Sequence, residues 1–336
     1  MNRRRPTVKD VAALAGVSPK TVSNVLTGAA SVTAQTRERV EAAMRELDYV
    51  PNYSARTLRN GRSGVIALAL PDLTTSFSAN LIHHFVQEAH ERGLAVQIEE
   101  TAKDPAREYE LLSRARAHQI DGLVLNPATL ADSAVEHSDA LPPVVLIGEV
   151  QQQRADQVCI DSVAAARDAT RHLIGRGARR IGVIGAPSVT FDTATAHTRF
   201  EGYRAAIAEA GLTFEPALSG SAAEWSPIGG RRAAEQVLDR ARPDALFCFT
   251  DSLALGAISA LWALGLRVPD DVLVCGFDDI PDAAAATPPL STIRLPLRAY
   301  AATALDLLEN RLVNRNSPPR RRVIAHELVV RASTGG

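Results

Sequence analysis

The sequence predicts an α/β protein in which two doubly wound parallel-sheet subdomains follow a small all-α domain. Its 336 residues are about twice the ~150 typical of one domain, so two or three folding units are expected. From residue 65 onward, apolar runs of strand length alternate with helical stretches, which is typical of parallel sheets covered by helices on both faces. Eight such runs divide more naturally into two sheets than into one.

The composition is that of a globular protein that can bury a core, with 46% apolar and 22% charged residues. No apolar run reaches the ~18 residues that a membrane span needs. Residues 1–5 are basic, but polar residues follow instead of the apolar stretch of a secretory leader, so we expect an intracellular protein. Cys159, Cys248 and Cys275 are far apart and odd in number, which favours neither a disulfide framework nor a CxxC site.

The net charge of −1 conceals two parts of opposite sign. Residues 1–64 carry 2 Lys and 9 Arg against 2 Asp and 3 Glu, a net charge of +6, which leaves −7 for the remainder. A small basic part on an acidic body suggests that the basic part binds a polyanion. The alternative is a solvated basic tail, but the periodic apolar positions of this segment indicate that it folds.

Three short helices are predicted in the basic part. Thr7 and Asp10 have the spacing of a capping box, and Gly16 ends the first helix. Ser18-Pro19 suits the start of a second helix, and Thr33 precedes a third. Two short helices joined by a tight turn and braced by a third describe a helix-turn-helix. The apolar positions at helical spacing are Val8, Val11, Ala12 and Ala15, then Val22, Val25 and Leu26, then Val40, Ala43, Met44 and Leu47.

The polar face of the second helix has the chemistry needed to contact DNA bases. An ammonium group suits guanine, an amide suits adenine, and hydroxyls contact either, as seen in major-groove recognition. From these residues alone, an ordinary solvated helix face is about as well supported. The residues on this face are Lys20, Ser23, Asn24 and Thr27.

Several ordered motifs resemble the DNA-binding domain of the LacI/GalR family of bacterial repressors. They are Thr7-Val8-Lys9-Asp10-Val11-Ala12, Ala15-Gly16-Val17-Ser18, Thr21-Val22-Ser23, Thr36-Arg37-Glu38-Arg39-Val40 and Leu47-Asp48-Tyr49-Val50-Pro51-Asn52. Asn24 stands where many members have Arg, so different bases are expected to be read there. The resemblance implies that a domain of residues 1–51 contacts operator DNA through Thr7, Ser18, Pro19, Lys20, Thr21, Ser23 and Asn24.

Residues 52–58 resemble the hinge helix of the same family, and residues 60–64 read as a flexible linker. A helix of about seven residues is too short to be stable alone, so a partner's hinge and DNA would have to brace it. Leu58 matches the leucine that wedges into the minor groove. A wholly flexible linker over 52–63 is the alternative. The hinge residues implied to contact DNA are Asn52, Tyr53, Ala55, Arg56 and Leu58.

The body, residues 64–336, has strand-like and helix-like segments in alternation. Ligands of open α/β sheets bind beyond the carboxyl ends of the strands. The predicted strands are 65–70, 96–98, 123–125, 144–147, 158–160, 181–184, 246–249 and 272–275, and the clearest predicted helices are 79–92, 162–176, 200–210 and 229–240.

Nothing in the sequence favours catalysis or a cofactor. The GxGxxG, GxxxxGK[ST], HExxH and GxSxG motifs are all missing. The eight histidines show no metal-ligand spacing, and adjacent His83 and His84 would point to different sides of a helix. We therefore expect no enzyme, no metal and no cofactor.

Polar residues follow several predicted strands, and taken singly each is more often a helix cap or turn residue than a ligand contact. Together they resemble the effector site of the LacI/GalR core, which is similar to a periplasmic sugar-binding protein. The resemblance implies that Arg199 clamps the effector, Asp278 accepts its hydrogen bonds and Trp225 stacks on its ring. Further implied contacts are Phe77, Asp161 and Thr250, the last standing where several sugar-responsive members have Asn.

The resemblance covers residues 7 to about 331. It implies one subdomain of about 64–162 plus 294–323 and another of about 163–291 plus 326–336. We expect a cytoplasmic, nucleoid-associated bacterial regulator, a repressor that binds pseudo-palindromic double-stranded DNA as a homodimer or tetramer. A sugar-like or nucleoside effector between the subdomains would control it. The alternatives are a transport-associated solute-binding protein, which should carry an export signal, and a metabolic enzyme fused to a DNA-binding domain.

Overall fold

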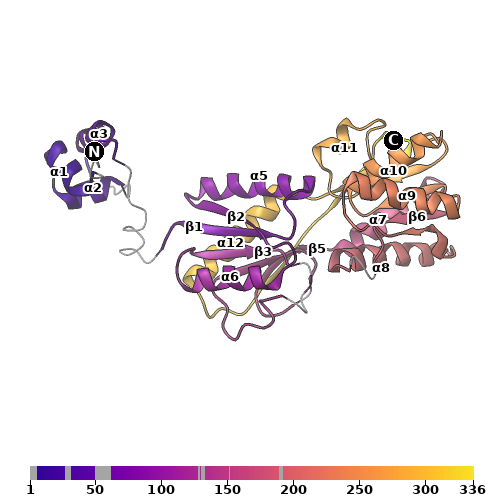
Figure 1. Cartoon of the computed structure of the whole chain (residues 1–336), viewed down its shortest axis with the longest axis horizontal. Coiled ribbons are helices and arrows are strands. Elements are labelled where there is room, and N and C mark those ends of the chain that lie inside the picture. Colours follow the sequence, from indigo (N-terminus) through magenta and orange to yellow (C-terminus); the bar gives the residue numbers. More distant parts are fainter. Residues whose placement is uncertain are drawn as a thin grey trace. The chain divides into compact units, whose positions relative to one another are not determined.

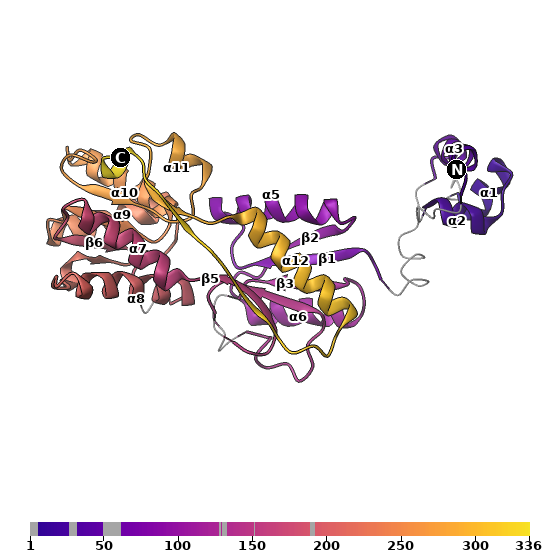
Figure 2. The ribbon, with the colours of Figure 1, turned by 180° about the vertical axis from the view of Figure 1, so that it is seen from behind.

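A computed structural model of the chain describes residues 6–26, 32–49, 62–127, 129, 133–150, 152–188 and 192–336. The chain divides into two compact units, Met1–Ser63 and Gly64–Gly336, and their elements are labelled in Figures 1 and 2. In the described part of the chain, none of the helices has the length and apolar character required to traverse a bilayer.

The first unit contains the three predicted helices, α1 (Val8–Ala15), α2 (Pro19–Leu26) and α3 (Ala34–Glu46). Their apolar faces meet in one small core, in which Val11, Val22 and Val40 are fully buried. The predicted capping box is confirmed, since Thr7 N donates to Asp10 Oδ2 at 2.7 Å and Asp10 N donates to Thr7 Oγ1 at 3.4 Å. The helix-turn-helix is therefore stabilised by local polar contacts as well as by its core.

Two arginines of α3 hold the first two helices in place. Arg39 Nη2 donates to the carbonyl oxygen of Gly16 at 3.2 Å, beyond the end of α1. Arg37 Nη1 donates to the carbonyl oxygen of Val25 at 3.5 Å, near the end of α2. A cation beside the last carbonyls of a helix satisfies orphaned acceptors and opposes the negative end of the helix dipole. Part of the basic charge of this unit is therefore structural.

The second unit contains two parallel sheets. The first subdomain is a six-stranded sheet of order β11-β5-β4-β3-β1-β2 with helices α5 (Ser76–Glu91), α6 (Pro105–Arg116) and α12 (Leu297–Val313). Its strands are β1 (Val65–Leu70), β2 (Ala95–Glu100), β3 (Gly122–Leu125), β4 (Val144–Ile147), β5 (Asp156–Ile160) and β11 (Arg321–Ile324). The second subdomain is a four-stranded sheet of order β7-β6-β8-β9. Its elements are β6 (Ile181–Ile184), β7 (Ser219–Gly220), β8 (Ala245–Cys248), β9 (Leu273–Cys275), α7 (Ser162–Gly175), α8 (Ala194–Glu209), α9 (Pro227–Arg240), α10 (Asp251–Ala263) and α11 (Pro281–Ala285).

Strand β1 shows why the first sheet is covered on both faces. Its residues alternate between two cores: Ile66 and Leu68 pack in the core that includes Phe85 of α5, whereas Ala67 and Ala69 pack in the core that includes residues of α6. Successive side chains of a strand point to opposite faces, so an uninterrupted apolar strand needs helices on both sides. The predicted doubly wound α/β fold is confirmed.

All eight predicted strands are present, and the described residues form four further strands that were not predicted. Two of these, β10 (Thr292–Arg294) and β12 (Glu327–Val329), form an antiparallel pair apart from both sheets, which we call the crossover ribbon. The third is β7, only two residues long, and the fourth is β11, an edge strand that begins with two exposed arginines. Short or polar strands carry little hydrophobic periodicity, so the sequence pattern could not reveal them.

The chain passes between the two subdomains three times. It leaves the first sheet after β5, returns through β10 into α12, and leaves again from β11 into β12. Figure 2 shows the last two connections running side by side, as their pairing in the crossover ribbon requires. Three connections link the two subdomains without a shared sheet, which permits relative motion about them.

Helices α9 and α10 approach each other almost backbone to backbone, because glycines lie where they meet. A Cβ on Gly256 would lie 2.1 Å from the carbonyl oxygen of Pro227, and a Cβ on Gly230 would lie 2.3 Å from that of Leu253. Real Cβ atoms do not approach oxygen this closely, so any larger residue would force the helices apart.

We predict that Gly256→Ala destabilises the second unit by about 1–3 kcal/mol, the usual range for overpacking. Gly175→Ala is the matched control, because a Cβ there meets nothing within 4 Å and alanine suits a helix better by ~0.5–1 kcal/mol. Denaturant unfolding followed by circular dichroism measures both. Equal stability of the two variants would contradict the close helix contact.

Candidate ligand-binding cleft and nucleic-acid interface

A cavity of about 260 Å³ lies between the two subdomains of the second unit. Residues that follow β1, β3 and β4 line it from one side, and residues of α8, α10 and the loops after β7 and β9 line it from the other. This is the strand-end position that the sequence predicted for a ligand site. Five of the six predicted effector contacts line the cavity, namely Phe77, Arg199, Trp225, Thr250 and Asp278.

The structure does not place Asp161 among the lining residues. Its carboxylate accepts a hydrogen bond from Ala164 N at 2.9 Å and so caps α7. Thr250 lines the cavity, but its hydroxyl likewise accepts a hydrogen bond from Leu253 N, at 3.2 Å, and caps α10. At both positions the helix-cap interpretation, left open by the sequence, describes what the side chain does.

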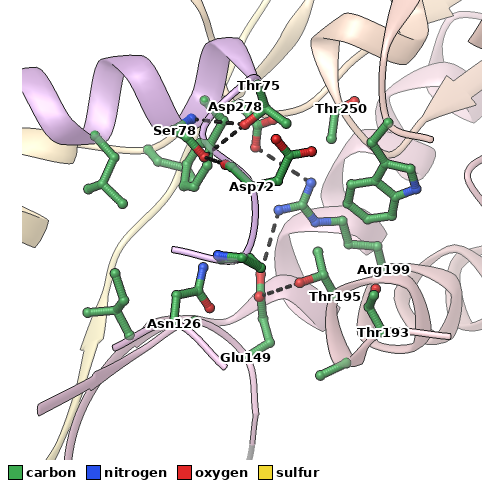
Figure 3. A pocket seen from close by; sticks show the side chains of 18 of the residues that line it. Asp72, Thr75, Ser78, Asn126, Glu149, Thr193, Thr195, Arg199, Thr250 and Asp278 are labelled. Atoms are coloured by element: carbon green, nitrogen blue, oxygen red, sulfur yellow. Dashed lines mark hydrogen bonds and ion pairs between the residues drawn. The ribbon is translucent and has the colours of Figure 1, made fainter. Parts of the chain in front are cut away.

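Arg199 is the centre of the cleft, and only 4% of it is exposed. Its guanidinium lies 3.6 Å from Glu149 and 3.5 Å from Asp278, and its Nη1 donates to the carbonyl oxygen of Phe249. Its carbon Cζ lies 3.6 Å from the ring centroid of Phe277 and 6.0 Å from that of Trp225. Figure 3 shows Arg199 between the carboxylates of Glu149 and Asp278. Together with the two aromatic faces, these carboxylates hold one buried cation in a single orientation.

One donor of Arg199 is still unused. Its Nε is buried and has no hydrogen-bond partner among the described residues. Buried polar groups are normally satisfied, so an unpaired donor beside a cavity is a site where a ligand oxygen or nitrogen would be stabilised.

Glu149 lines the cleft and contacts Arg199, and the sequence analysis did not single it out. It follows β4 in the first subdomain, yet its carboxylate accepts hydrogen bonds from Ser162 Oγ and Thr195 Oγ1 of the second subdomain, each at 2.7 Å. Its ion pair with Arg199 makes a third contact across the cleft. The available signal was its position just after the predicted strand 144–147, which the strand-end rule marks as a place for ligand contacts.

Asp278 is held in an unusual backbone conformation. Its φ is +111° and its side chain is buried, pointing toward Arg199 (Figure 3). Burial raises the pKa of this carboxyl well above its ordinary value, and Asp251 and Glu149 act in the same direction while Arg199 opposes them. The carboxyl group is thus held beside Arg199 at the wall of the cleft.

Charged groups on the cleft wall are predominantly acidic. Burial lowers the pKa of Lys103, and the nearby Asp72 partly opposes this. Lys103 and Arg199 are the lining cations, against the carboxyl groups of Asp72, Glu149, Glu224 and Asp278. Within the described ranges, no cluster of three or more His, Cys, Asp and Glu side chains could hold a metal ion.

The structure describes the predicted DNA contacts of the helix-turn-helix but not those of the hinge. Ser18, Pro19 and Lys20 are exposed at the start of α2, and Ser18 Oγ accepts a hydrogen bond from Thr21 N at 3.1 Å. The other predicted residues of this unit, Thr7, Thr21, Ser23 and Asn24, are half-buried. The implied hinge contacts, Asn52, Tyr53, Ala55, Arg56 and Leu58, lie outside the described residues, as does Thr27.

A helix-turn-helix unit joined to a two-subdomain unit with a polar, buried cleft defines a DNA-binding regulator with a ligand site. Residues 7–52 match the model of bacterial regulatory proteins of the lacI family, and residues 170–334 match a periplasmic binding protein-like domain. The HTH-type transcriptional repressor CytR of Escherichia coli (strain K12) is 33% identical over 331 residues, 98% of this chain and 96% of that protein.

Two solved structures extend the comparison over nearly the whole chain. The lac repressor dimer bound to operator and the anti-inducer ONPF has a TM-score of 0.83 and 28% identity, covering 98% of this chain and 99% of that one. The transcriptional regulator CelR in complex with cellobiose has a TM-score of 0.73 and 31% identity, covering 98% and 100%. The chain belongs to the LacI family of bacterial regulatory proteins. It is a transcriptional regulator and not an enzyme.

Asp251, at the first turn of α10, supports the floor of the cleft from behind. It is fully buried, and its carboxylate accepts hydrogen bonds from Thr292 Oγ1 at 2.5 Å and Ile280 N at 2.9 Å. Burial raises the pKa of Asp251 to about 7, although these hydrogen bonds oppose the shift. A group whose folded pKa exceeds its unfolded value of ~3.9 adds stability at low pH that is lost as the pH rises through about 7.

We therefore predict that Asp251→Asn removes a pH-dependent part of the free energy of unfolding. Between about pH 5 and pH 7, wild-type stability should fall more steeply than that of the variant, by at most ~1.4 kcal/mol per pH unit for one group. Urea unfolding at half-unit pH steps measures both slopes. Parallel slopes in wild type and variant would show that Asp251 does not titrate in this range.

Proposed function

We propose that this protein represses transcription by binding a pseudo-palindromic operator as a homodimer, under the control of a sugar-like or nucleoside metabolite in the cleft. The observation that carries the proposal is the Arg199 cluster, in which groups from both subdomains converge on one buried cation beside an unused donor. A ligand that contacts this cluster touches both subdomains at once. Its binding therefore favours one relative arrangement of the subdomains over others.

The charges of the cleft favour an uncharged ligand. Arg199 is already matched by two carboxylates, and the remaining lining carboxyl groups outnumber Lys103. A phosphate or carboxylate would meet this excess of acidic groups in a buried site. Trp225 and Phe77 offer apolar surface for the flat side of a ring. A neutral polyhydroxyl compound fits both features, and no cofactor is required.

The proposed mechanism joins the cleft to the DNA-binding unit through residues 52–63. In a dimer, a change of angle between the subdomains would move the two positions at which this segment joins the second unit, near residue 63 of each copy. The segments would then form or lose paired helices, and operator affinity would follow. Such coupling is typically ~1–3 kcal/mol and acts equally in both directions. A regulator of this kind works in the bacterial cytoplasm, associated with the nucleoid when it is bound to DNA.

Two experiments test the proposal together. Selection from a randomised duplex pool should yield a pseudo-palindromic sequence whose binding weakens steeply with salt. Gel shifts with that duplex are then repeated with cellobiose, glucose, adenosine and cytidine, and at least one should change the Kd several-fold. Selection of no sequence at all would contradict the DNA-binding function. A duplex whose Kd no metabolite changes would contradict the proposed effector class.

For the cleft we predict that Arg199→Lys weakens binding of the active metabolite by at least tenfold. A lysine keeps the charge but loses the planar group that contacts two carboxylates and two rings. Arg204→Lys is the matched control, because Arg204 lies on the same helix and stacks on Phe214 outside the cleft. Isothermal titration calorimetry measures both, and equal affinities would remove Arg199 from the binding site.

An exposed apolar stripe on α9 and α10 supports the homodimer. On α10, Leu255, Ile258 and Trp262 recur at helical spacing, the first two half-buried and Trp262 82% exposed. On the adjoining helix α9, Ile228 is 61% exposed. Aromatic side chains at the centre of an apolar patch are typical anchors of a protein interface. The operator symmetry in the proposal requires two copies, so a second copy is the expected partner.

We predict that Trp262→Glu converts the dimer to a monomer at micromolar concentration, because an unpaired charge would be buried at the interface. Tyr109→Glu is the control, since Tyr109 is also large and 51% exposed but lies on α6 of the other subdomain. Size-exclusion chromatography with light scattering gives the mass of each. A Trp262→Glu dimer would place the interface elsewhere, and a tetrameric wild type would require a second interface.

A further inference from the structure

The loop after β9 contains two consecutive aspartates whose side chains contact different parts of the molecule. Asp278 has a φ of +111° and Asp279 a φ of +53°, and neither is a glycine. Two adjacent residues in the left-handed region are unfavourable, so surrounding contacts must hold them there. Asp278 faces Arg199 in the cleft, whereas Asp279 faces the crossover ribbon. The proposed function uses Asp278 and gives no role to Asp279.

Asp279 fastens the crossover ribbon at both of its strands. Its carboxylate accepts Arg294 Nε, at the end of β10, and Arg331 Nη2, just after β12, each at 2.6 Å. Only 10% of the Asp279 side chain is exposed, so solvent screens these ion pairs weakly. The backbone makes a further tie, because Asp278 N donates to the carbonyl oxygen of Ile293 at 2.8 Å.

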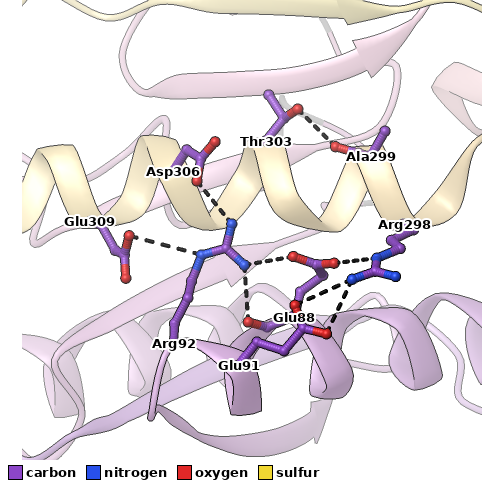
Figure 4. Close-up of polar contacts among 8 residues, drawn as sticks. All are labelled: Glu88, Glu91, Arg92, Arg298, Ala299, Thr303, Asp306 and Glu309. Atoms are coloured by element: carbon purple, nitrogen blue, oxygen red, sulfur yellow. Dashed lines mark hydrogen bonds and ion pairs between the residues drawn. The ribbon is translucent and has the colours of Figure 1, made fainter.

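From the ribbon, a second set of ion pairs leads to the first subdomain. Three residues after β10 the chain enters α12, and Arg298 there pairs with Glu88 at 2.6 Å and Glu91 at 3.1 Å on α5. One turn further along α5, Arg92 pairs with Glu88 at 2.7 Å and with Asp306 of α12 at 2.9 Å (Figure 4). These ion pairs fasten α12 to α5, so a shift of β10 would act directly on the two helices.

The space beside Asp279 is open. A second cavity, of about 270 Å³, is lined by both aspartates, by Arg294 and Arg331, and by residues of α5 and α11. Close-packed side chains resist displacement, whereas a cavity leaves room for side chains to move. The ion pairs of Asp279 with Arg294 and Arg331 can therefore shift without a collision with the core.

We propose that Asp279 is a positioning residue that couples occupancy of the cleft to the crossover ribbon. A contact that displaces Asp278 also displaces Asp279, because the two share a peptide bond and a strained backbone. The Asp279 carboxylate transfers the displacement to Arg294 and Arg331, and α12 passes it to α5. The inference rests on the proposed function only in taking Asp278 as a ligand contact. The competing explanation is that Asp279 merely stabilises the fold.

The first test needs neither the metabolite nor the operator. Hydrogen exchange of the ribbon amides is measured by mass spectrometry in full-length wild type, Arg199→Lys, Asp279→Asn and the double variant. Arg199→Lys disturbs the cleft and should raise ribbon exchange at least threefold in the wild-type background. In the Asp279→Asn background, the same Arg199→Lys substitution should increase the ribbon exchange rate by less than half of that factor. An equal increase in both backgrounds, or no increase in either, would overturn the proposal.

The second test separates coupling from stability. In Asp279→Asn, the Kd of the active compound among cellobiose, glucose, adenosine and cytidine should stay within about threefold of wild type. The ratio of duplex Kd values with and without that compound should fall to less than a third of the wild-type ratio. A lower melting temperature with an unchanged ratio would assign Asp279 a structural role only. If none of the four compounds is active, the effector class fails, and the exchange experiment alone decides on Asp279.

Two further variants serve as a matched control and as a replacement for Asp279→Asn. Asp271→Asn is the matched control, because Asp271 accepts hydrogen bonds from Arg267 N at 2.8 Å and Nε at 3.1 Å but does not touch the ribbon. It should leave both ribbon exchange and the Kd ratio unchanged. If Asp279→Asn does not fold, Arg294→Gln replaces it. The Arg294 side chain is 43% exposed, and its loss removes one of the two ion pairs of Asp279. A wild-type ratio and wild-type exchange response in that variant would equally overturn the proposal.

Discussion

A guanidinium taken out of water must be matched by negative charge and hydrogen bonds, because the desolvation of one unpaired ion costs several kcal/mol. Arg199 meets this requirement with Glu149 from one subdomain and with Asp278 from the loop after β9 of its own subdomain. These partners come from segments far apart in the chain. The two sheets must therefore be placed so that their strand ends face one another, and that arrangement creates the cleft.

The neighbouring polar groups extend this constraint outward. Asp251 ties the start of α10 to Thr292 of the ribbon, and Asp279 ties the next loop to Arg294 and Arg331. Residues next to the cleft wall thus also hold the connections between the subdomains. The proposed coupling uses these contacts, because a displacement of the loop beside the cleft would act on the same side chains that hold the connections.

Elements with a local sequence signal could be predicted, whereas elements and contacts that depend on distant residues could not. The helix-turn-helix and the eight predicted strands follow from apolar runs, periodicity and capping residues, which act over a few neighbouring positions. The crossover ribbon did not, since each of its short strands includes a charged residue and the two pair across more than thirty residues of sequence. In the site, Arg199, Asp278 and Trp225 were found through family resemblance, whereas Glu149 was missed and Asp161 proved to be a helix cap.

By itself the sequence determined the class of fold, the division into a basic DNA-binding unit and an acidic body, and the family of the protein. These properties depend on composition, periodicity and ordered motifs, which are local in the chain. Only the tertiary structure decided which charges meet. Whether a carboxylate caps a helix, as Asp161 does, or neutralises a buried arginine, as Glu149 does, depends on what lies beyond the strand end in space, and no short-range pattern records that.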